Sequence, residues 1–263
     1  MEQELAGRTA FVSGSTQGIG YAIAAALLRE GASVVINGRS EERVETAAAS
    51  LRAEVPGADV GGIPADFGDA AQVDRLTEAL AGTDILVNNV GVFELKEFAE
   101  ISDAEWARYV DVNLMSGVRS ARAALPGMLE RGWGRILFVA SESGVDVPAD
   151  MIHYGVTKAA TIALGNGLAK LTRGTGVTVN SILGGPTYSH GVAETVAAIA
   201  TAQGMPVEDL KAAITAGNQT SLLQRFIEPG EIAHLAAYLA SPRSSATNGA
   251  ALRADGGTLT TML

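Results

Sequence analysis

Tyr154 and Lys158 are the two side chains in this sequence whose types and spacing best suit acid–base chemistry. They are four positions apart, so on a helix they share one face, one turn from each other. An ammonium beside a phenol stabilises the phenolate, which lowers the pKa of the tyrosine toward neutrality and lets it exchange protons with a substrate. Many exposed helices carry the same spacing by chance, so the pair alone does not identify a site.

A serine upstream supplies a third candidate group. Ser141 directly follows the apolar run 135–140, which predicts a buried strand. A hydroxyl at the end of a strand and a Tyr–Lys pair at the start of a helix can converge on one small site. Ser143 is the alternative hydroxyl. Glu142, between the two serines, is expected either to line the pocket and select a polar or cationic substrate, or to face solvent.

Composition narrows the classes of protein to consider. The chain has 263 residues, of which 47% are hydrophobic, no cysteine and a net charge of −10. This acidity argues against nucleic acid or an anionic membrane surface as a partner, and the absence of cysteine excludes disulfides and thiolate chemistry. No apolar run is long enough to span a membrane and no signal pattern opens the sequence, so we expect a cytoplasmic protein.

A glycine-rich turn near the start of the chain suggests a phosphate site. The apolar run 9–12 predicts a strand, and helical spacing of apolar residues follows up to Gly31. Between them lie Gly14, Gly18 and Gly20, where glycines permit a tight turn and let backbone N–H groups approach a pyrophosphate at the helix N-terminus. The alternative is a tight turn that binds no ligand.

The end of the second predicted strand, 33–36, bears on which dinucleotide would bind. In a dinucleotide fold this position meets the adenosine ribose, where an acidic side chain favours NAD. The sequence has no Asp or Glu from Gly31 to Ser40, but it has Arg39, whose planar fork suits a 2′-phosphate. We therefore favour NADP(H) over NAD(H), the alternative being that Arg39 is a solvated surface residue.

Strands and helices alternate along the rest of the chain. Further apolar runs at 60–64, 84–87, 135–140, 177–182 and 250–253 are separated by helical patterns, the one from 103 to about 128 containing Asn113. Uninterrupted apolar strands alternating with helices predict an α/β fold, a Rossmann-like doubly wound parallel sheet of about seven strands with helices on both faces. No feature of the sequence divides residues 1–263 into two domains. The helix-prone segment 188–224 departs from the alternation of strands and helices, and we expect it to form either a substrate lid or ordinary packed helices.

Several separated motifs in this order resemble the short-chain dehydrogenase/reductase family, in its compact single-domain branch. Residues 13–20 resemble the family's T-G-x-x-x-G-x-G loop, 88–91 resemble N-N-A-G, and 255–257 resemble its C-terminal D-G-G, while Asn180 matches the strand before the usual P-G turn. That turn reads Gly184-Gly185 here, so its proline is missing. The resemblance covers nearly the whole chain. Within the family, the sequence resembles the 3-oxoacyl thioester reductases.

The resemblance implies a catalytic tetrad and a set of cofactor contacts. The tetrad is Asn113, Ser141, Tyr154 and Lys158. The implied cofactor contacts are Gly14, Ser15, Gln17, Gly18, Ile19, Gly20, Arg39, Ser40, Asp66, Phe67, Asn89, Val90, Gly91, Tyr154, Lys158, Gly185 and Thr187.

The implied activity is reversible hydride transfer between a ketone and NADP(H). Tyr154 would donate a proton to the carbonyl oxygen, Ser141 would stabilise the developing charge, and Lys158 would bind the nicotinamide ribose. Asn113 would anchor a water that passes protons to Lys158. The alternative is a non-catalytic NADP(H) sensor, which would not need the Ser–Tyr–Lys set.

The resemblance also implies a homotetramer, with a dimer as the second choice, formed through the helices that contain Asn113 and Lys158. The expected partner is a small carbonyl or alcohol substrate. The three histidines, His153, His190 and His234, have no metal-ligand spacing, so no metal is expected.

Overall fold

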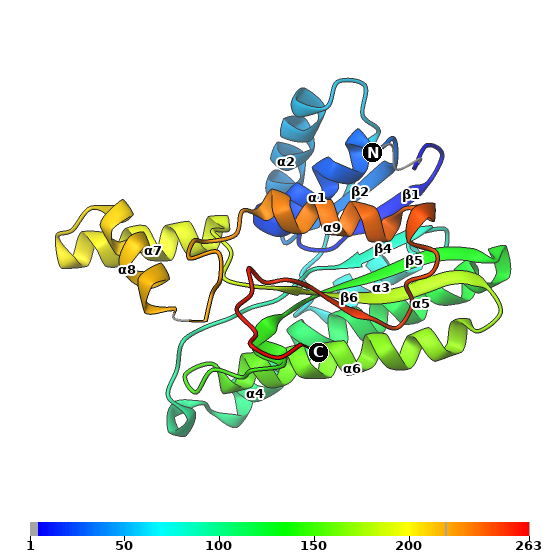
Figure 1. Ribbon diagram of the computed structural model, residues 1–263. Coiled ribbons are helices and arrows are strands. Elements are labelled where there is room, and N and C mark those ends of the chain that lie inside the picture. The colour runs from blue at the N-terminus through cyan, green and yellow to red at the C-terminus, as the bar shows by residue number, and fades with distance from the viewer. Residues whose placement is uncertain (1–4, 219, 263) are drawn as a thin grey trace.

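Seven parallel strands form the centre of the molecule (Figure 1), in the order β3-β2-β1-β4-β5-β6-β7. The computed structural model describes residues 5–218 and 220–262. The strands are β1 Thr9–Val12, β2 Ser33–Gly38, β3 Val60–Pro64, β4 Ile85–Asn88, β5 Trp133–Ser141, β6 Gly176–Gly184 and β7 Ala251–Ala254. The predicted doubly wound α/β fold of about seven strands is confirmed.

Helices cover both faces of this sheet, as uninterrupted apolar strands require. α1, α2 and α9 share one buried core, whereas α3 and α5 share the other, against which Leu164 and Leu168 of α6 pack. The helices are α1 Gly18–Arg29, α2 Glu41–Glu54, α3 Ala70–Glu78, α4 Asp103–Tyr109, α5 Ser116–Arg131, α6 Ile152–Ala169, α7 His190–Gln203, α8 Val207–Gly217 and α9 Pro229–Ala240. None of the described helices combines the length and apolar character needed to cross a bilayer.

Two helix starts follow directly from capping side chains. Asp69 accepts hydrogen bonds from the backbone N–H groups of Ala71 and Gln72, which caps the start of α3. Ser102 caps α4 and forms a capping box with Glu105.

β5 and β6 are longer than their apolar runs predicted. They pair in parallel from Trp133–Gly176 to Ser141–Gly184, because backbone hydrogen bonding continues past the last large apolar residue of each strand. Ser141 is therefore the last residue of β5 rather than the first residue after it. It lies at the carboxyl edge of the sheet, where ligands bind in open α/β folds.

The predicted continuous helix from 103 to about 128 is interrupted by a π-helical turn, Val110–Met115. Asn113 lies in this turn and is buried. Its side chain accepts a hydrogen bond from Val92 N at 2.7 Å and donates to Val92 O at 2.9 Å and to Thr157 Oγ1 at 3.1 Å. The turn therefore lets Asn113 tie the loop after β4 to α6, and π-helical turns often mark functional sites.

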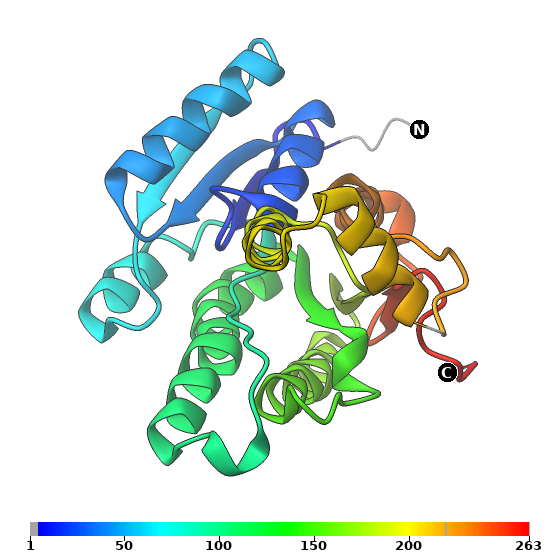
Figure 2. The same cartoon turned by 90° about the vertical axis from the view of Figure 1, so that its left-hand side faces the viewer.

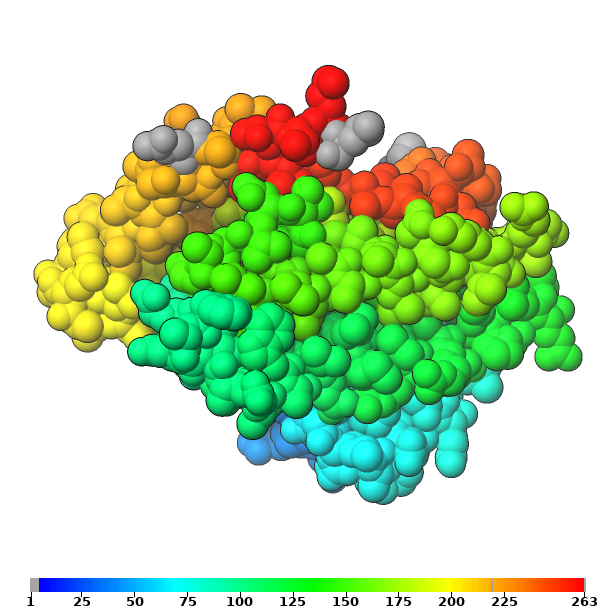
Figure 3. Space-filling model, turned by 90° about the horizontal axis from the view of Figure 1, so that it is seen from below, coloured from blue at the N-terminus to red at the C-terminus, as the bar shows by residue number. Residues whose placement is uncertain are grey.

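The segment after β6 forms the helix pair α7 and α8, which projects from the carboxyl edge of the sheet (Figure 1; Figure 2 views it from that side). The pair has a small core of its own, built on Val196, Ala200 and Leu210. Figure 3 shows the pair, in yellow, at one end of the face formed by the green segments that include α5 and α6. Both helices lie within the segment 188–224 that was predicted to be helix-prone, and its role as a lid stays a prediction.

Asn180, in the middle of β6, holds the segment that leads into β7. Its side chain donates to Thr247 O at 2.8 Å and accepts from Ala250 N at 3.1 Å, and it is 1% exposed. We expect Asn180→Ala to lower the free energy of unfolding by about 2 to 4 kcal/mol, because two buried backbone groups lose their partners. Urea denaturation measures this loss.

Asn166→Ala is the matched control for this prediction. Asn166 is exposed, and its side chain donates a hydrogen bond to Gly249 O. Its replacement should cost less than about 1 kcal/mol, and equal losses in the two variants would contradict the account of β6.

Candidate active site

The four residues of the predicted tetrad come from three elements that meet at the carboxyl edge of the sheet. Ser141 ends β5, Tyr154 and Lys158 lie in the first two turns of α6, and Asn113 lies in the π-helical turn. Ser141, Lys158 and Asn113 are buried, and Tyr154 is half-buried. The structure thus brings together side chains that are far apart in the sequence.

Lys158 is held in place by the strand that carries Ser141. Its Nζ donates to Val139 O at 2.8 Å and lies 5.6 Å from the centroid of the Tyr154 ring. A Cβ built on Gly91 would lie 3.4 Å from Lys158 Nζ and 3.6 Å from Asn113 Oδ1, so both polar atoms face the same side of Gly91. A side chain at position 91 would contact both of them.

Burial dominates the electrostatics of the Tyr–Lys pair. It raises the pKa of Tyr154 to about 12, with a smaller contribution from the Glu142 charge, although the Ser141 hydrogen bond acts in the opposite direction. The expected lowering of the Tyr154 pKa is therefore absent in this structure. Burial also lowers the pKa of Lys158 to about 8, opposed by Glu142, so at neutral pH Tyr154 keeps its proton and Lys158 is mostly charged.

Glu142 faces the site rather than solvent. Its Oε2 accepts a hydrogen bond from Ser141 Oγ at 2.5 Å, and burial raises the pKa of its carboxyl group. Ser143, the alternative hydroxyl, lies on the other side of Glu142, with its Oγ 3.4 Å from Oε1. Ser141 is the serine that interacts with the Tyr154 phenol.

The glycine-rich loop is shaped for close backbone contact. Gly14 has φ +59°, a left-handed conformation that favours glycine. A Cβ on Gly20 would lie 2.5 Å from both Gly14 O and Asn89 Nδ2. Asn89 in turn donates to Ser13 O and Gly14 O, each at 3.0 Å, which ties the predicted cofactor loop to the end of β4.

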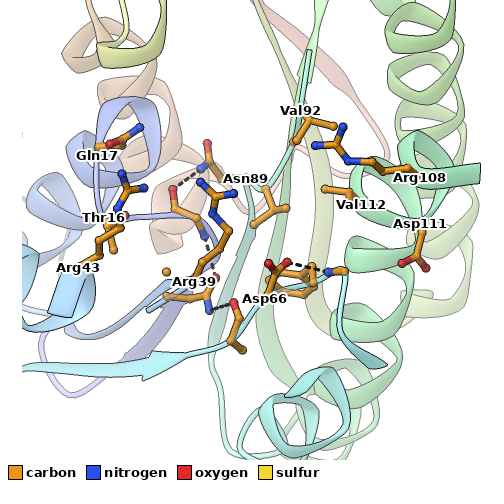
Figure 4. A pocket seen from close by; sticks show the side chains of 18 of the residues that line it. Thr16, Gln17, Arg39, Arg43, Asp66, Asn89, Val92, Arg108, Asp111 and Val112 are labelled. Carbon is orange, nitrogen blue, oxygen red and sulfur yellow. Dashed lines mark hydrogen bonds between the residues drawn. The ribbon is translucent and has the colours of Figure 1, made fainter. Parts of the chain in front are cut away.

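A cavity of about 740 Å³ opens between this loop, the end of β2 and the π-helical turn. In Figure 4, Arg39, Arg43 and Gln17 lie on one side of it, and Arg108 and Val112 lie on the other. The volume suits a dinucleotide. Of the predicted cofactor residues, those that line the cavity are Gly14, Gln17, Arg39, Asp66, Phe67, Asn89, Val90 and Gly91.

The other predicted cofactor residues lie outside the lining of this cavity. They are Ser15, Gly18, Ile19, Gly20, Ser40, Tyr154, Lys158, Gly185 and Thr187. Ser15 is fully buried, and its hydroxyl donates to Val12 O and accepts from Asn37 N. Ser40 caps α2, and Thr187 donates to Gly185 O.

Sequence reasoning missed several lining residues, namely Thr16, Asn37, Arg43, Arg108 and Asp111. Asn37 accepts from Gly14 N at 3.1 Å and donates to Ile63 O and Ala65 O, so it links the glycine-rich loop to the ends of β2 and β3. A polar residue at the end of an apolar strand was the available signal for Asn37. For Arg43 it was a second arginine one turn beyond Arg39.

No cluster of three or more metal-ligating side chains occurs among residues 5–218 and 220–262. His153 is buried against Tyr109, with ring centroids 3.9 Å apart. Because burial lowers its pKa, it packs as a neutral aromatic ring between α4 and α6.

The chain is similar to known oxidoreductases over nearly its whole length. A family model described as enoyl-(acyl carrier protein) reductase matches residues 14–259. The uncharacterized oxidoreductase YvaG of Bacillus subtilis is 43% identical over 258 residues, which cover 98% of each chain. The D-beta-hydroxybutyrate dehydrogenase of Cupriavidus necator is 35% identical over 257 residues, which cover 96% of this chain and 98% of that one.

Among solved structures, the L-sorbose reductase of Gluconobacter frateurii, in complex with NADPH and L-sorbose, is similar over 100% of both chains. The sequence identity is 31% and the TM-score is 0.94.

The lowered pKa of Lys158 makes stability depend on pH. Between pH 8 and 10 the unfolded chain keeps a proton on this lysine that the folded chain has released, so raising the pH favours the folded state. We expect the free energy of unfolding of the wild type, minus that of Lys158→Met, to rise by about 1 to 3 kcal/mol between pH 8 and pH 10. Urea denaturation at each pH measures it.

Lys170→Met provides the control, because Lys170 is exposed at the end of α6. Its stability should run parallel to that of the wild type between pH 8 and 10. Parallel curves for Lys158→Met as well would show that Lys158 has an ordinary pKa.

Proposed function

This chain belongs to the short-chain dehydrogenase/reductase family of oxidoreductases, and we propose that it interconverts a ketone and a secondary alcohol, with NADP(H) as hydride carrier and Tyr154 as general acid and base. The observation that supports this most is the meeting of Ser141, Tyr154 and Lys158 at the carboxyl edge of the sheet, beside the cavity. A protein that only senses a dinucleotide would not need these three groups together.

The residues around the cavity fit a nicotinamide dinucleotide phosphate. The close approach of Gly20 to Gly14 and Asn89 leaves no room for a side chain and exposes backbone N–H groups at the start of α1, where a pyrophosphate is stabilised. Arg39 and Arg43 both line the cavity near the end of β2 and would pair with a 2′-phosphate. The sorbose reductase from G. frateurii was solved with NADPH, which supports NADP(H) over NAD(H).

When bound, the nicotinamide supplies the hydride that reaches the carbonyl carbon. Tyr154 donates its phenolic proton to the carbonyl oxygen, and its raised pKa keeps that proton available at neutral pH. Ser141 donates a hydrogen bond to the same oxygen and stabilises the charge that develops there. The Lys158 ammonium stabilises the phenolate that remains on Tyr154.

Asn113 is suited to hold a water molecule through which a proton returns to Lys158 and Tyr154. Its two amide hydrogens are taken by Val92 O and Thr157 Oγ1, and Oδ1 already accepts from Val92 N. One lone pair of Oδ1 remains, on the side of Gly91 that Lys158 Nζ also faces. A water held there would hydrogen-bond to both residues.

We also propose that the chain acts in the cytoplasm as a homotetramer assembled through α4, α5 and α6. Val110 and Val156, next to Asn113 and Lys158, are 39% and 45% exposed. A second copy that covered them would bury apolar surface close to the site. Light scattering on the purified protein tests the assembly.

The Tyr154→Phe variant tests the proposed chemistry. It removes the phenolic proton and little else, so we expect kcat for carbonyl reduction to fall by at least about 10²-fold, in the range of general acid–base catalysis. NADPH consumption would be followed with L-sorbose, acetoacetate, a 3-oxoacyl thioester, a ketosteroid, a quinone and an aryl ketone. Retained activity in the variant would refute the role of Tyr154.

Arg39→Ala combined with Arg43→Ala tests the cofactor assignment. We expect the KM for NADPH to rise about 10- to 100-fold and the KM for NADH to change little, because charge-assisted hydrogen bonds to the 2′-phosphate are lost. Arg52→Ala is the control, since Arg52 also lies on α2 but donates to Val60 O instead of lining the cavity. Equal effects on NADPH and NADH would contradict a 2′-phosphate site.

A further inference from the structure

We propose that Glu142 is a positioning residue that sets the direction in which the Ser141 hydroxyl donates its proton, so that carbonyl reduction is fastest when Glu142 is protonated. The inference rests on the proposed reductase function and adds to it a residue outside the predicted tetrad. Its basis is the set of hydrogen bonds around one oxygen atom, Ser141 Oγ.

Three groups surround Ser141 Oγ. The Glu142 Oε2 atom lies 2.5 Å away, and Ser143 N donates to Oγ at 3.1 Å. The third group, the Tyr154 phenol, interacts with the Ser141 hydroxyl, which acts to lower the pKa of Tyr154. A serine hydroxyl has one proton to donate and two lone pairs to accept with, so it can donate to only one of Glu142, Tyr154 and a substrate oxygen at a time.

The protonation state of Glu142 decides to which group the Ser141 hydroxyl donates its proton. An ionised carboxylate only accepts, so the Ser141 proton must go to Glu142. Ser143 N takes one lone pair of Oγ, and Ser141 then has no proton left for a substrate oxygen. A protonated Glu142 donates to Ser141 instead, and the Ser141 proton is then free for the carbonyl oxygen. Glu142 keeps its own proton throughout, so no bond breaks at this residue.

The surroundings of Glu142 favour the protonated form. The carboxyl group forms no ion pair within the described part of the chain. Burial raises its pKa, while its hydrogen bonds from Ser141 and Ser143 act in the opposite direction. Lys158 is close enough for its charge to interact with Glu142 but forms no ion pair with it, so burial has the largest effect on the pKa of Glu142.

Each element around Glu142 contributes identifiable groups. Lys158 and Tyr154 of α6 interact electrostatically with its charge, and Tyr109 of α4 acts on Tyr154. Beside Ser141, β6 contributes the uncharged Gly184. The nearby Asp255 carboxylate is already paired with Arg253 and with backbone N–H groups.

A first experiment measures the hydrogen bond without any substrate. Infrared difference spectra of the full-length protein would be recorded during a pH titration, and the Glu142 carboxyl band would be assigned by its loss in Glu142→Gln. We expect titration above the ordinary carboxyl range and a further rise in Ser141→Ala, because the ionised form then loses a donor. Ser143→Ala, which removes the 3.4 Å contact, should shift the band less. An ordinary pKa, or no response to Ser141→Ala, would overturn the proposal.

A second experiment measures kcat for reduction against pH, at saturating NADPH, with whichever carbonyl compound from the panel is reduced fastest. We expect wild-type kcat to fall about 10²-fold as pH rises through the Glu142 titration, the loss typical of removing one donor to a developing oxyanion. Glu142→Gln, whose amide can donate at every pH, should lose this decline, and Ser143→Ala should keep it. A decline that persists unchanged in Glu142→Gln would assign it to Lys158 and overturn the proposal.

The proposed reductase function and the positioning role of Glu142 can be refuted separately. Activity retained in Tyr154→Phe would refute the proposed function itself. Activity lost in Tyr154→Phe, together with identical pH profiles for wild type and Glu142→Gln, would refute the positioning role alone. In a Ser141→Ala background, Glu142→Gln should change kcat no further, because the residue through which it acts is gone.

Discussion

The parallel pairing of β5 with β6 is the constraint on which the site depends. It continues to the Ser141–Gly184 pair and so delivers a hydroxyl to the carboxyl edge of the sheet. The same strand offers Val139 O to Lys158 Nζ, which fixes the lysine of α6 relative to that hydroxyl. Helix α6 then places Tyr154 one turn away from Lys158. One strand end therefore sets the positions of all three groups.

Burial at this edge also sets the chemistry. It holds the proton on Tyr154, partly discharges Lys158 and raises the pKa of Glu142. Each shift favours the neutral form of its group, as a medium of low polarity requires. In the proposed reaction, Tyr154 would donate its proton, and the charge on Lys158 would stabilise the phenolate that remains.

Much of this was predictable from the sequence. Apolar runs located every strand, since a parallel sheet buried on both faces needs no polar alternation. Strand ends were misjudged where hydrogen bonding continues past the large apolar residues, as at Ser141. The π-helical turn was missed because it depends on the tertiary bonds of Asn113 with Val92. The prediction that Lys158 lowers the pKa of Tyr154 was wrong for this structure, because the spacing of the two residues in the sequence carries no information about their burial.

The central claim is that hydride and proton reach one carbonyl group at the edge of β5. The most direct measurement supplies NADPH deuterated at the nicotinamide C4 position and locates the label in the alcohol product by NMR spectroscopy. The account predicts deuterium on the carbinol carbon, one atom per molecule of NADPH consumed. The two faces of the nicotinamide would be labelled in separate experiments. A product without deuterium on the carbinol carbon in both experiments would contradict the proposed hydride transfer.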